Sequence, residues 1–288
     1  MPELPEVETV RRGLEPAMVG AVFRAVETRR PDLRFPLPPR FAGRLVGATV
    51  QSLGRRGKYL TAALSTGETL IMHLGMSGRF TIAASGAGAR PGAFHHAAAT
   101  DPAHDHIAFL MDGPGGFLRI DYNDPRRFGF MDLAASAALS STSHFKDMGP
   151  EPTEDGFTPA MLAAALAARR APVKAALLDQ RVIAGLGNIY VCEALFAAGV
   201  SPRRPASTLS QTRIARLHGA IRATLAEAIL AGGSSLRDFA ASDGALGYFQ
   251  HRFKVYDREG ASCPVCKARV RRIVQAGRST FYCGKCQR

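Results

Sequence analysis

The chain has 288 residues, 46% of them hydrophobic, and its 37 Lys and Arg residues outnumber its 24 Asp and Glu residues to give a formal net charge of +13. This length allows two domains and a further small module, and no apolar run reaches the ~20 residues that a membrane-spanning helix needs. The excess of positive charge favours a polyanionic partner, with nucleic acid ahead of an anionic membrane surface. Acidic residues stand near the start of the chain, where a signal peptide carries positive charge, so we expect a cytoplasmic, nucleoid-associated protein in contact with DNA.

The first part of the chain predicts one helix followed by many short strands. Apolar residues recur at helical spacing from residue 6 to about residue 20, with Pro5 near the first turn. From about residue 22 to residue 133, Gly, Pro and Asn/Asp turns separate the β-rich runs KYLTAAL, TLIMHLGM, RFTIA, HIAFLM and FLRIDY. This pattern predicts an antiparallel sandwich or barrel. Residues 83–103 are rich in Ala and Gly without strand periodicity, so we expect a surface loop there.

The pattern becomes helical after a linker of Pro, Gly and acidic residues near 148–157. Thr158 is expected to cap a helix that begins at Pro159, and a second helical piece is expected over residues 173–180. A third helix is expected from Asn188, and the longest runs from Ser210 to the glycine pair at 232 and 233. The sequence therefore predicts an α+β multidomain protein with a β-rich half, a helical half and a small terminal module.

Two CxxC pairs stand in the terminal module, and a 16-residue spacer separates one pair from the other: Cys263 and Cys266, then Cys283 and Cys286. Two such knuckles can bring four thiolates around one tetrahedral Zn²⁺, and a site made only of cysteines is closed and structural. Disulfides or a redox pair are the alternatives, which a cytosolic chain without a neighbouring βαβ pattern disfavours. Arg271, Arg272 and Arg278 lie on the intervening hairpin as phosphate contacts or as solvated side chains. The remaining cysteine, Cys192, is expected to be a small buried apolar residue.

The start of the chain carries a candidate nucleophile. A small second residue such as Pro2 permits removal of the initiator methionine, which exposes a secondary amine. An α-amino group has a pKa near 8, so a useful fraction is neutral at physiological pH and can form a Schiff base with a sugar carbon. A proline at this position is common and has no such meaning by itself.

Several motifs together resemble the formamidopyrimidine-DNA glycosylases of the bacterial zinc-finger type. They occur in order as MPELPEVET, RGKYL (56–60), HLGMSGRF (73–80), HDH (104–106), DPRRFG (124–129), GLGNIY (185–190) and GRSTFYCGKCQ. The resemblance implies an N-terminal β-sandwich with an N-terminal helix, a helix–two-turns–helix domain and a C-terminal zinc-ribbon finger with four cysteine ligands. We place these domains at residues 1–134, 135–233 and 256–288, with a lesion-recognition loop and connector at 234–255.

The resemblance also implies catalytic roles. Pro2 matches the family's nucleophile, and Glu3 matches its general acid, a role that requires a sheltered carboxyl. Lys58 matches the lysine that assists β-elimination. Arg278 matches the finger arginine associated with δ-elimination, although its high pKa suits it better to clamping a phosphate. Acids at a helix N-terminus also stabilise the helix, and this reading stays open for Glu3 and Glu6.

Other matching residues are implied to contact DNA. Met76, Arg126 and Phe128 match a trio that fills the hole left by an extruded nucleotide, with Phe128 as a wedge and Arg126 donating to the orphaned base, typically cytosine. Each of the three is a routine residue when taken alone, and His73 is as easily a packing residue. Residues 234–250 match a loop that folds over the flipped base. His104, Lys174 and Asn188 match DNA-backbone contacts, Arg169 stands where the family carries basic residues near the DNA, and His73 is a further candidate for DNA binding.

The implied activity is that of a bifunctional glycosylase and AP lyase of base excision repair, acting on 8-oxoguanine and formamidopyrimidines in double-stranded DNA. One structural Zn²⁺ and a monomer are expected. Two alternatives remain: an endonuclease VIII-like enzyme for oxidised pyrimidines, and a zinc-ribbon DNA-binding protein that has lost the chemistry. The long loop at 83–103 and Ala103 depart from the family pattern, which puts DNA contacts near residues 104–106 in doubt.

Overall fold

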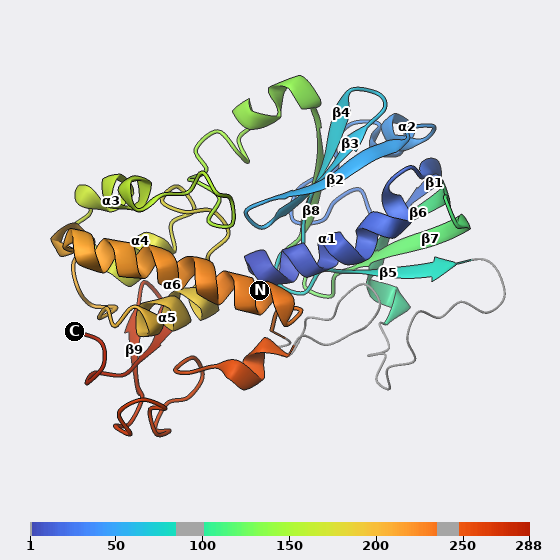
Figure 1. The fold of residues 1–288 in the computed structure, drawn as a ribbon. Coiled ribbons are helices and arrows are strands. Elements are labelled where there is room, and N and C mark those ends of the chain that lie inside the picture. The colour runs from blue at the N-terminus through green and yellow to red at the C-terminus, as the bar shows by residue number, and fades with distance from the viewer. Residues whose placement is uncertain (1, 85–100, 235–247) are drawn as a thin grey trace. The chain divides into compact units, whose positions relative to one another are not determined.

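The computed structural model describes residues 2–84, 101–234 and 248–288. The chain divides into two compact units, residues 1–146 with 232–248 and residues 147–231 with 249–288 (Figure 1). Antiparallel sheets make up most of the first unit and helices most of the second, which confirms the expected α+β class. The four-segment division expected from the sequence stays a prediction. Most of the Ala/Gly-rich stretch and of the 234–250 loop lies outside the described residues.

The first unit contains two four-stranded antiparallel sheets. One has the strand order β1-β6-β7-β5 and the other the order β2-β3-β4-β8. The strands of the first sheet are β1 (Val22–Thr28), β5 (Arg79–Ala84), β6 (Asp105–Gly113) and β7 (Gly116–Asn123). Those of the second are β2 (Val50–Arg56), β3 (Tyr59–Leu64), β4 (Glu68–His73) and β8 (Phe130–Ala135). The predicted β-rich half is therefore a sandwich in which every sheet neighbour is antiparallel.

Helix α1 (Leu4–Met18) packs against strands of both sheets, β2 and β3 of one and β6 of the other (Figure 1). Leu4, Leu14 and Met18 recur at helical spacing, so they share one face of α1. This apolar face packs on the sheets, and all three side chains are fully buried. One hydrophobic cluster joins this face to the inward side chains of both sheets. The short helix α2 (Phe41–Leu45) and the 3-10 turns η1 (Pro102–His104) and η2 (Ser136–Ser141) complete the unit.

The second unit is helical, with α3 (Pro159–Ala167), α4 (Val173–Leu177), α5 (Asn188–Ala197), the 3-10 turn η3 (Ala206–Thr208) and α6 (Gln211–Leu230). The predicted cap at Thr158 is confirmed, and Ser210 caps the longest helix in the same way. The Thr158 hydroxyl accepts a hydrogen bond from the Met161 backbone N–H, and the Ser210 hydroxyl accepts one from the Arg213 N–H. Helix α4 ends three residues before the expected position 180, and α6 ends at Leu230 shortly before the glycine pair.

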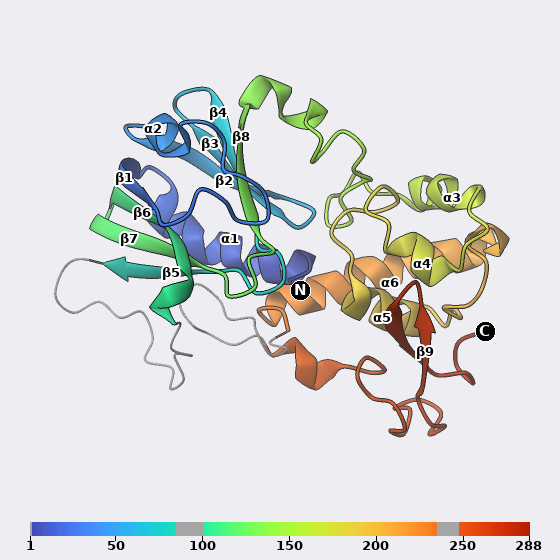
Figure 2. The same cartoon turned by 180° about the vertical axis from the view of Figure 1, so that it is seen from behind.

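The finger follows the 3-10 turn η4 (Phe249–Arg252) and is built on the hairpin of β9 (Arg271–Gln275) and β10 (Arg278–Tyr282). Ala276 and Gly277 form its two-residue turn with φ values of +48° and +71°. Positive φ at both positions is what a type I′ turn requires. Figure 2 shows this hairpin beside α5, and Cys192 and Phe196 of α5 share a buried cluster with Cys263 and Phe281. Cys192 is thus a buried apolar residue, as expected.

Candidate functional site

The start of α1 holds the candidate nucleophile and acid in a sheltered place. Pro2 is buried, and Glu3 is 3% exposed at the position that caps the helix. The Glu6 carboxylate, itself buried, accepts a hydrogen bond of 2.8 Å from the Glu3 backbone N–H. The exposed N–H groups and dipole of a helix N-terminus stabilise negative charge, so this end of α1 suits buried carboxylates.

Glu6 also connects this helix end to a segment far along the chain. Its other carboxylate oxygen accepts hydrogen bonds from the Ser234 backbone N–H, at 2.8 Å, and from the Ser234 hydroxyl, at 3.0 Å. Gly233 has a φ of +78°, which favours glycine, and a Cβ at this position would come within 3.0 Å of Glu6. The residue that opens the expected lesion loop is therefore fixed to the helix that carries Glu3.

Lys58 lies in the turn between β2 and β3 and is 7% exposed. The preceding Gly57 has a φ of +56°, and its carbonyl accepts a hydrogen bond of 3.0 Å from the Arg55 guanidinium. Arg55 in turn donates to Glu8 of α1 at 3.2 Å. Burial alone would raise the pKa of Glu8, but hydrogen bonds from two neighbouring arginines on α1 and the charge of Arg55 hold it below its ordinary value. An ionised Glu8 thereby fixes the turn that presents Lys58.

His73 is the last residue of β4. Its neutral ring packs against its neighbours and accepts one hydrogen bond. Its ring stacks on Phe130 with the ring centroids 5.3 Å apart. Burial, with the charges of Lys58 and Arg34, lowers the pKa of His73 to about 4. Its Nδ1 atom accepts a hydrogen bond of 3.0 Å from the Gly75 N–H, which leaves Nε2 as the donor. His73 can therefore donate to a DNA phosphate without carrying a charge.

The three candidate void-filling residues lie on two loops of the first unit. Met76 is half-buried between β4 and β5, whereas Arg126 and Phe128 are exposed between β7 and β8. The Arg126 guanidinium lies over the Phe128 ring at 5.0 Å from its centroid. His104 lies next to the loop between β7 and β8, since its carbonyl accepts a hydrogen bond from the Asp124 N–H. An exposed aromatic ring beside a guanidinium suits contact with unstacked bases.

The candidate DNA contacts of the second unit are in different environments. Arg169 pairs with Asp179 at 2.9 Å, and hydrogen bonds from Arg181, with those from Arg169, lower the pKa of Asp179 to about 2. Lys174 is fully buried in α4. Asn188 begins α5 and donates a hydrogen bond of 2.9 Å to the Ser279 carbonyl in β10. This bond brings Asn188 next to the strand that begins with the exposed Arg278.

The finger cysteines fit one zinc ion. Their four sulfur atoms lie within 4.8 Å of one another. The sulfurs of Cys266 and Cys283 are 3.4 Å apart and those of Cys263 and Cys286 are 3.9 Å apart, close to the ~3.8 Å edge of a tetrahedron with Zn–S bonds of about 2.3 Å. Disulfides, with sulfurs about 2.05 Å apart, are excluded. Four thiolates this close together need a cation to balance their charge, and a site of four cysteines suits Zn²⁺.

Models of known families match most of the chain. Residues 1–131 match the formamidopyrimidine-DNA glycosylase N-terminal domain, residues 148–240 match the H2TH domain of the same enzymes, and residues 262–288 match the zinc finger found in FPG and IleRS. A formamidopyrimidine-DNA glycosylase of Sinorhizobium fredii is 55% identical over 296 residues, and one of Brucella ovis is 56% identical over 292 residues, each covering 100% of both chains.

The chain belongs to the formamidopyrimidine-DNA glycosylase family.

Solved structures of this family have the same fold. MutM (Fpg) of Thermus thermophilus gives a TM-score of 0.84 at 39% identity, covering 99% of this chain and 98% of that one. A variant Fpg of Lactococcus lactis in complex with DNA containing Fapy-dG gives a TM-score of 0.85 at 34% identity, with 99% of each chain covered. Family membership confirms the resemblance drawn from the motifs. No helix in the described part of the chain combines the length and hydrophobicity needed to cross a membrane.

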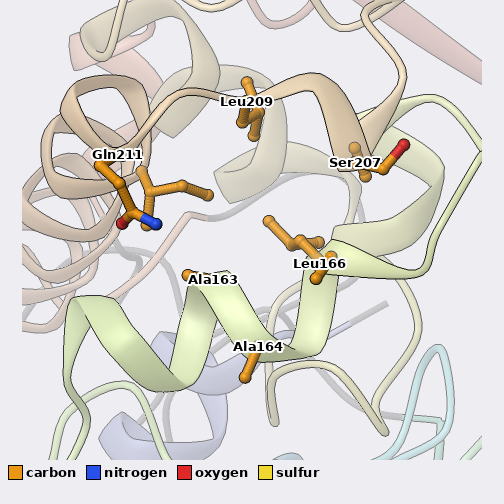
Figure 3. Close-up of a pocket in the computed structure, with 9 residues that line it drawn as sticks. Ala163, Ala164, Leu166, Ser207, Leu209 and Gln211 are labelled. Carbon is orange, nitrogen blue, oxygen red and sulfur yellow. The ribbon is translucent and has the colours of Figure 1, made fainter.

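A hollow of about 400 Å³ in the second unit is unrelated to the family's motifs (Figure 3). In Figure 3, Ala163 and Leu166 of α3 face Leu209 and Ser207, with Gln211 at the start of α6. Its lining contains no acid, base or thiol, so it offers no group for proton transfer or nucleophilic attack. The hollow therefore does not compete with the start of α1 as the reaction site.

The structure adds residues that the sequence did not single out. Glu193, 4% exposed in α5, accepts hydrogen bonds from the backbone N–H groups of residues 254, 255 and 256, which lead into the finger. Glu8 and Arg55 support the Lys58 turn, and Asp124 is buried between the two loops of the void-filling trio. An acid among apolar neighbours, as in NIYVCEALF, is the signal that could have indicated Glu193, and Asp124 stands in the motif DPRRFG.

Proposed function

We propose that this chain is a bifunctional DNA glycosylase and AP lyase that removes 8-oxoguanine and formamidopyrimidines from duplex DNA. Family membership over the whole chain supports the activity. The observation that carries the assignment of residues is the burial of Pro2 and Glu3 together at the N-terminus of α1. A buried carboxyl next to an α-amino nitrogen supplies a general acid and a nucleophile at one place.

The reaction begins when the Pro2 nitrogen, freed by removal of Met1, attacks C1′ of the damaged nucleotide. The bond from C1′ to the base breaks, and the base leaves with a proton. Glu3 donates a proton to the deoxyribose ring oxygen, the ring opens, and the nitrogen and C1′ form an iminium Schiff base. Loss of a C2′ proton then expels the 3′ phosphate, and a second elimination expels the 5′ phosphate. Lys58 assists the first elimination, and Arg278 holds the phosphate at the lesion.

The other predicted residues hold the DNA. Met76, Arg126 and Phe128 fill the space of the extruded nucleotide, and His73, His104, Arg169, Lys174 and Asn188 contact the DNA backbone. The exposed pair of Arg126 and Phe128 supports this role, since one offers donors to an unpaired base and the other an apolar wedge. Asn188 supports it through its bond to the strand of Arg278. Arg169 already pairs with Asp179 and Lys174 is fully buried, so both side chains have to rearrange before they contact DNA.

One Zn²⁺ held by the four finger cysteines supplies structure and no chemistry to the reaction. The chain's own contribution is to hold Arg278 at the start of β10, directly after the type I′ turn. Glu193 and Asn188 connect the finger to α5 through hydrogen bonds. We further propose that the protein acts as a monomer in the cytoplasm on nucleoid DNA, and light scattering of the protein with and without a lesion duplex tests the monomer.

Borohydride trapping tests the chemistry, because reduction converts the Schiff base into a stable protein–DNA bond. The wild-type protein is expected to be trapped on a duplex with 8-oxoguanine opposite cytosine, with the DNA attached at residue 2. Pro2→Gly keeps a primary amine and is expected to be trapped far less. Absence of any adduct from the wild type, or a mature chain that keeps Met1, overturns the enzyme assignment and leaves a DNA-binding protein.

A second substrate class merits direct comparison. A Lactococcus lactis Fpg has been crystallised with DNA containing an oxidised pyrimidine. Single-turnover excision of 8-oxoguanine and of thymine glycol from matched duplexes separates the purine reading from the endonuclease VIII-like one. We expect faster excision of 8-oxoguanine, and a reversed preference refutes the purine assignment.

A further inference from the structure

Asp124 is a fully buried carboxylate that the reaction scheme does not use. It stands between β7 and the loop that carries Arg126 and Phe128. Its two oxygens accept hydrogen bonds from the Ser77 hydroxyl at 2.6 Å, the Gly129 N–H at 2.8 Å and the Tyr122 hydroxyl at 3.3 Å. Burying a carboxylate without such donors costs free energy, so the position of Asp124 depends on all three of them. Asp124 and its three donors are called the Asp124 network below.

This set joins two loops that are distant in the sequence. Ser77 follows Met76 in the loop between β4 and β5, and its hydroxyl, which donates to Asp124, also accepts a hydrogen bond of 3.2 Å from the Arg126 N–H. Gly129, the third partner of Asp124, directly follows Phe128. Arg126 is therefore hydrogen-bonded into this network, and Met76 and Phe128 are each adjacent in sequence to a residue that is.

Glycines bring the same two loops into backbone contact. A Cβ on Gly75, which has a φ of +61°, would lie 2.3 Å from the Gly129 nitrogen. A Cβ on Gly78 would lie 2.4 Å from the Tyr122 hydroxyl oxygen, and a Cβ on Gly129 would lie 1.8 Å from it. No side chain fits between these backbones, so neither loop can shift far without moving the other.

Tyr122 completes the network from β7. It is fully buried, and burial together with the charge of Asp124 raises its pKa well above the ordinary value. The phenol therefore keeps its proton and remains a donor to Asp124.

We propose that Asp124 is a positioning residue that fixes the Met76 loop to the Arg126–Phe128 loop, so that the trio enters DNA as one rigid unit and discriminates between the bases opposite the lesion. The inference rests on the proposed function. Discrimination by Arg126 depends on hydrogen-bond geometry, which a shift of about 1 Å abolishes. Met76 on one loop can act together with Arg126 and Phe128 on the other only if the two loops keep a fixed spacing.

The test uses two variants and a matched control. Asp124→Asn keeps the shape but leaves one acceptor oxygen for three donors, and Ser77→Ala removes the hydroxyl that connects Asp124 to Arg126 without touching the charge. Asp121→Asn changes a carboxylate on the same strand that pairs with Arg119 instead. Each protein is assayed in single turnover on duplexes with 8-oxoguanine opposite cytosine or adenine. Each is also assayed by borohydride trapping on a single-stranded abasic oligonucleotide, which offers no opposing base.

Both variants are expected to lose about tenfold in excision opposite cytosine, the value of one hydrogen bond to a buried charge, with a smaller loss opposite adenine. The cytosine-to-adenine ratio therefore falls, while trapping on the single strand and the behaviour of Asp121→Asn stay at wild-type levels. If Asp124→Asn does not fold, Ser77→Ala decides. An unchanged ratio in a folded Ser77→Ala variant, or an equal loss on all three substrates, overturns the proposal. Failure of the wild type to be trapped at all refutes the proposed function instead.

Discussion

The Glu6 carboxylate lies 2.8 Å from the backbone nitrogen of Ser234, although 228 residues separate the two in the chain. With its other oxygen the same carboxylate binds the N–H of Glu3, so one buried side chain holds both the start of α1 and the start of the segment after α6. Glu6 accepts from the backbone N–H of both residues and from the Ser234 hydroxyl, so the positions of both segments depend on it. Glu6 does not reach the reacting sugar in the proposed scheme, but it fixes a residue that does.

Replacing Glu6 by Gln should destabilise the first unit and slow excision. The amide keeps one acceptor oxygen, but its NH₂ group faces an N–H that also donates. The backbone N–H left without an acceptor lowers the free energy of unfolding by about 1–3 kcal/mol. Urea unfolding measures the change, and single-turnover excision of 8-oxoguanine measures its effect on the site. Glu15→Gln is the control, since Glu15 pairs with Arg11 on the same helix at the surface and should cost less than about 0.5 kcal/mol. Equal effects of the two substitutions would contradict the anchoring role of Glu6.

The Glu6–Ser234 contact also shows where sequence reasoning ends. Local signals predicted the elements well: Thr158 and Ser210 cap helices as their residue types suggest, and the β-rich runs became strands. The four finger cysteines were predicted because ligand spacing is a local property. Which backbone groups the buried Glu193 would bind was not predictable, because the N–H groups of residues 254–256 lie 61 to 63 residues away in the chain and carry no side-chain signature.

The low pKa of His73 predicts acid sensitivity. Its folded pKa of about 4 lies below the unfolded value of about 6.5, so the unfolded chain binds more protons between these values. The stabilisation that neutral His73 provides is complete above pH ~6.5 and is lost as the pH falls toward 4, on the order of 3 kcal/mol in total. His73→Asn keeps an acceptor for Gly75 but does not titrate. The stability advantage of the wild type over this variant should be constant above pH 7 and should shrink on acidification, as denaturant unfolding at several pH values would show. An advantage that grows in acid would contradict the neutral ring.

Removing one finger thiolate should release zinc and weaken DNA binding together. Cys283→Ser leaves three thiolates, and since metal affinity supplies folding free energy to such small modules, the hairpin of β9 and β10 should unfold. Elemental analysis should give one zinc per wild-type chain and much less in the variant, with a parallel loss of affinity for a lesion duplex. Cys192→Ala is the control, because Cys192 contacts the finger core but stands outside the cluster of four sulfurs. Full DNA affinity in a zinc-free protein would refute the structural role of the metal.

Glu193→Gln should loosen the finger while leaving its zinc bound. One carboxylate oxygen accepts from the Val255 and Tyr256 N–H groups and the other from the Lys254 N–H, so the amide can satisfy only one side. We expect a loss of about 1–3 kcal/mol in the stability of the second unit, since a buried backbone donor loses its partner. Hydrogen exchange at residues 254–256 should accelerate at constant zinc content. Glu227→Gln, at an exposed position of α6, should change neither the stability of the second unit nor the hydrogen exchange. Slow exchange at residues 254–256 in Glu193→Gln would argue against the contact.

The salt dependence of binding can separate phosphate clamping by Arg278 from acid catalysis. If Arg278 neutralises one phosphate, Arg278→Ala should reduce the slope of log affinity against log salt concentration by about 0.9. Arg278→Lys should restore that slope, because the charge remains, but not the excision rate, because an ammonium lacks the planar fork that holds a phosphate through two hydrogen bonds. Arg222→Ala serves as the control, since the Arg222 charge is paired with Asp155 and its removal should leave the slope unchanged. A normal slope in Arg278→Ala with a large loss in strand cleavage would favour proton donation instead.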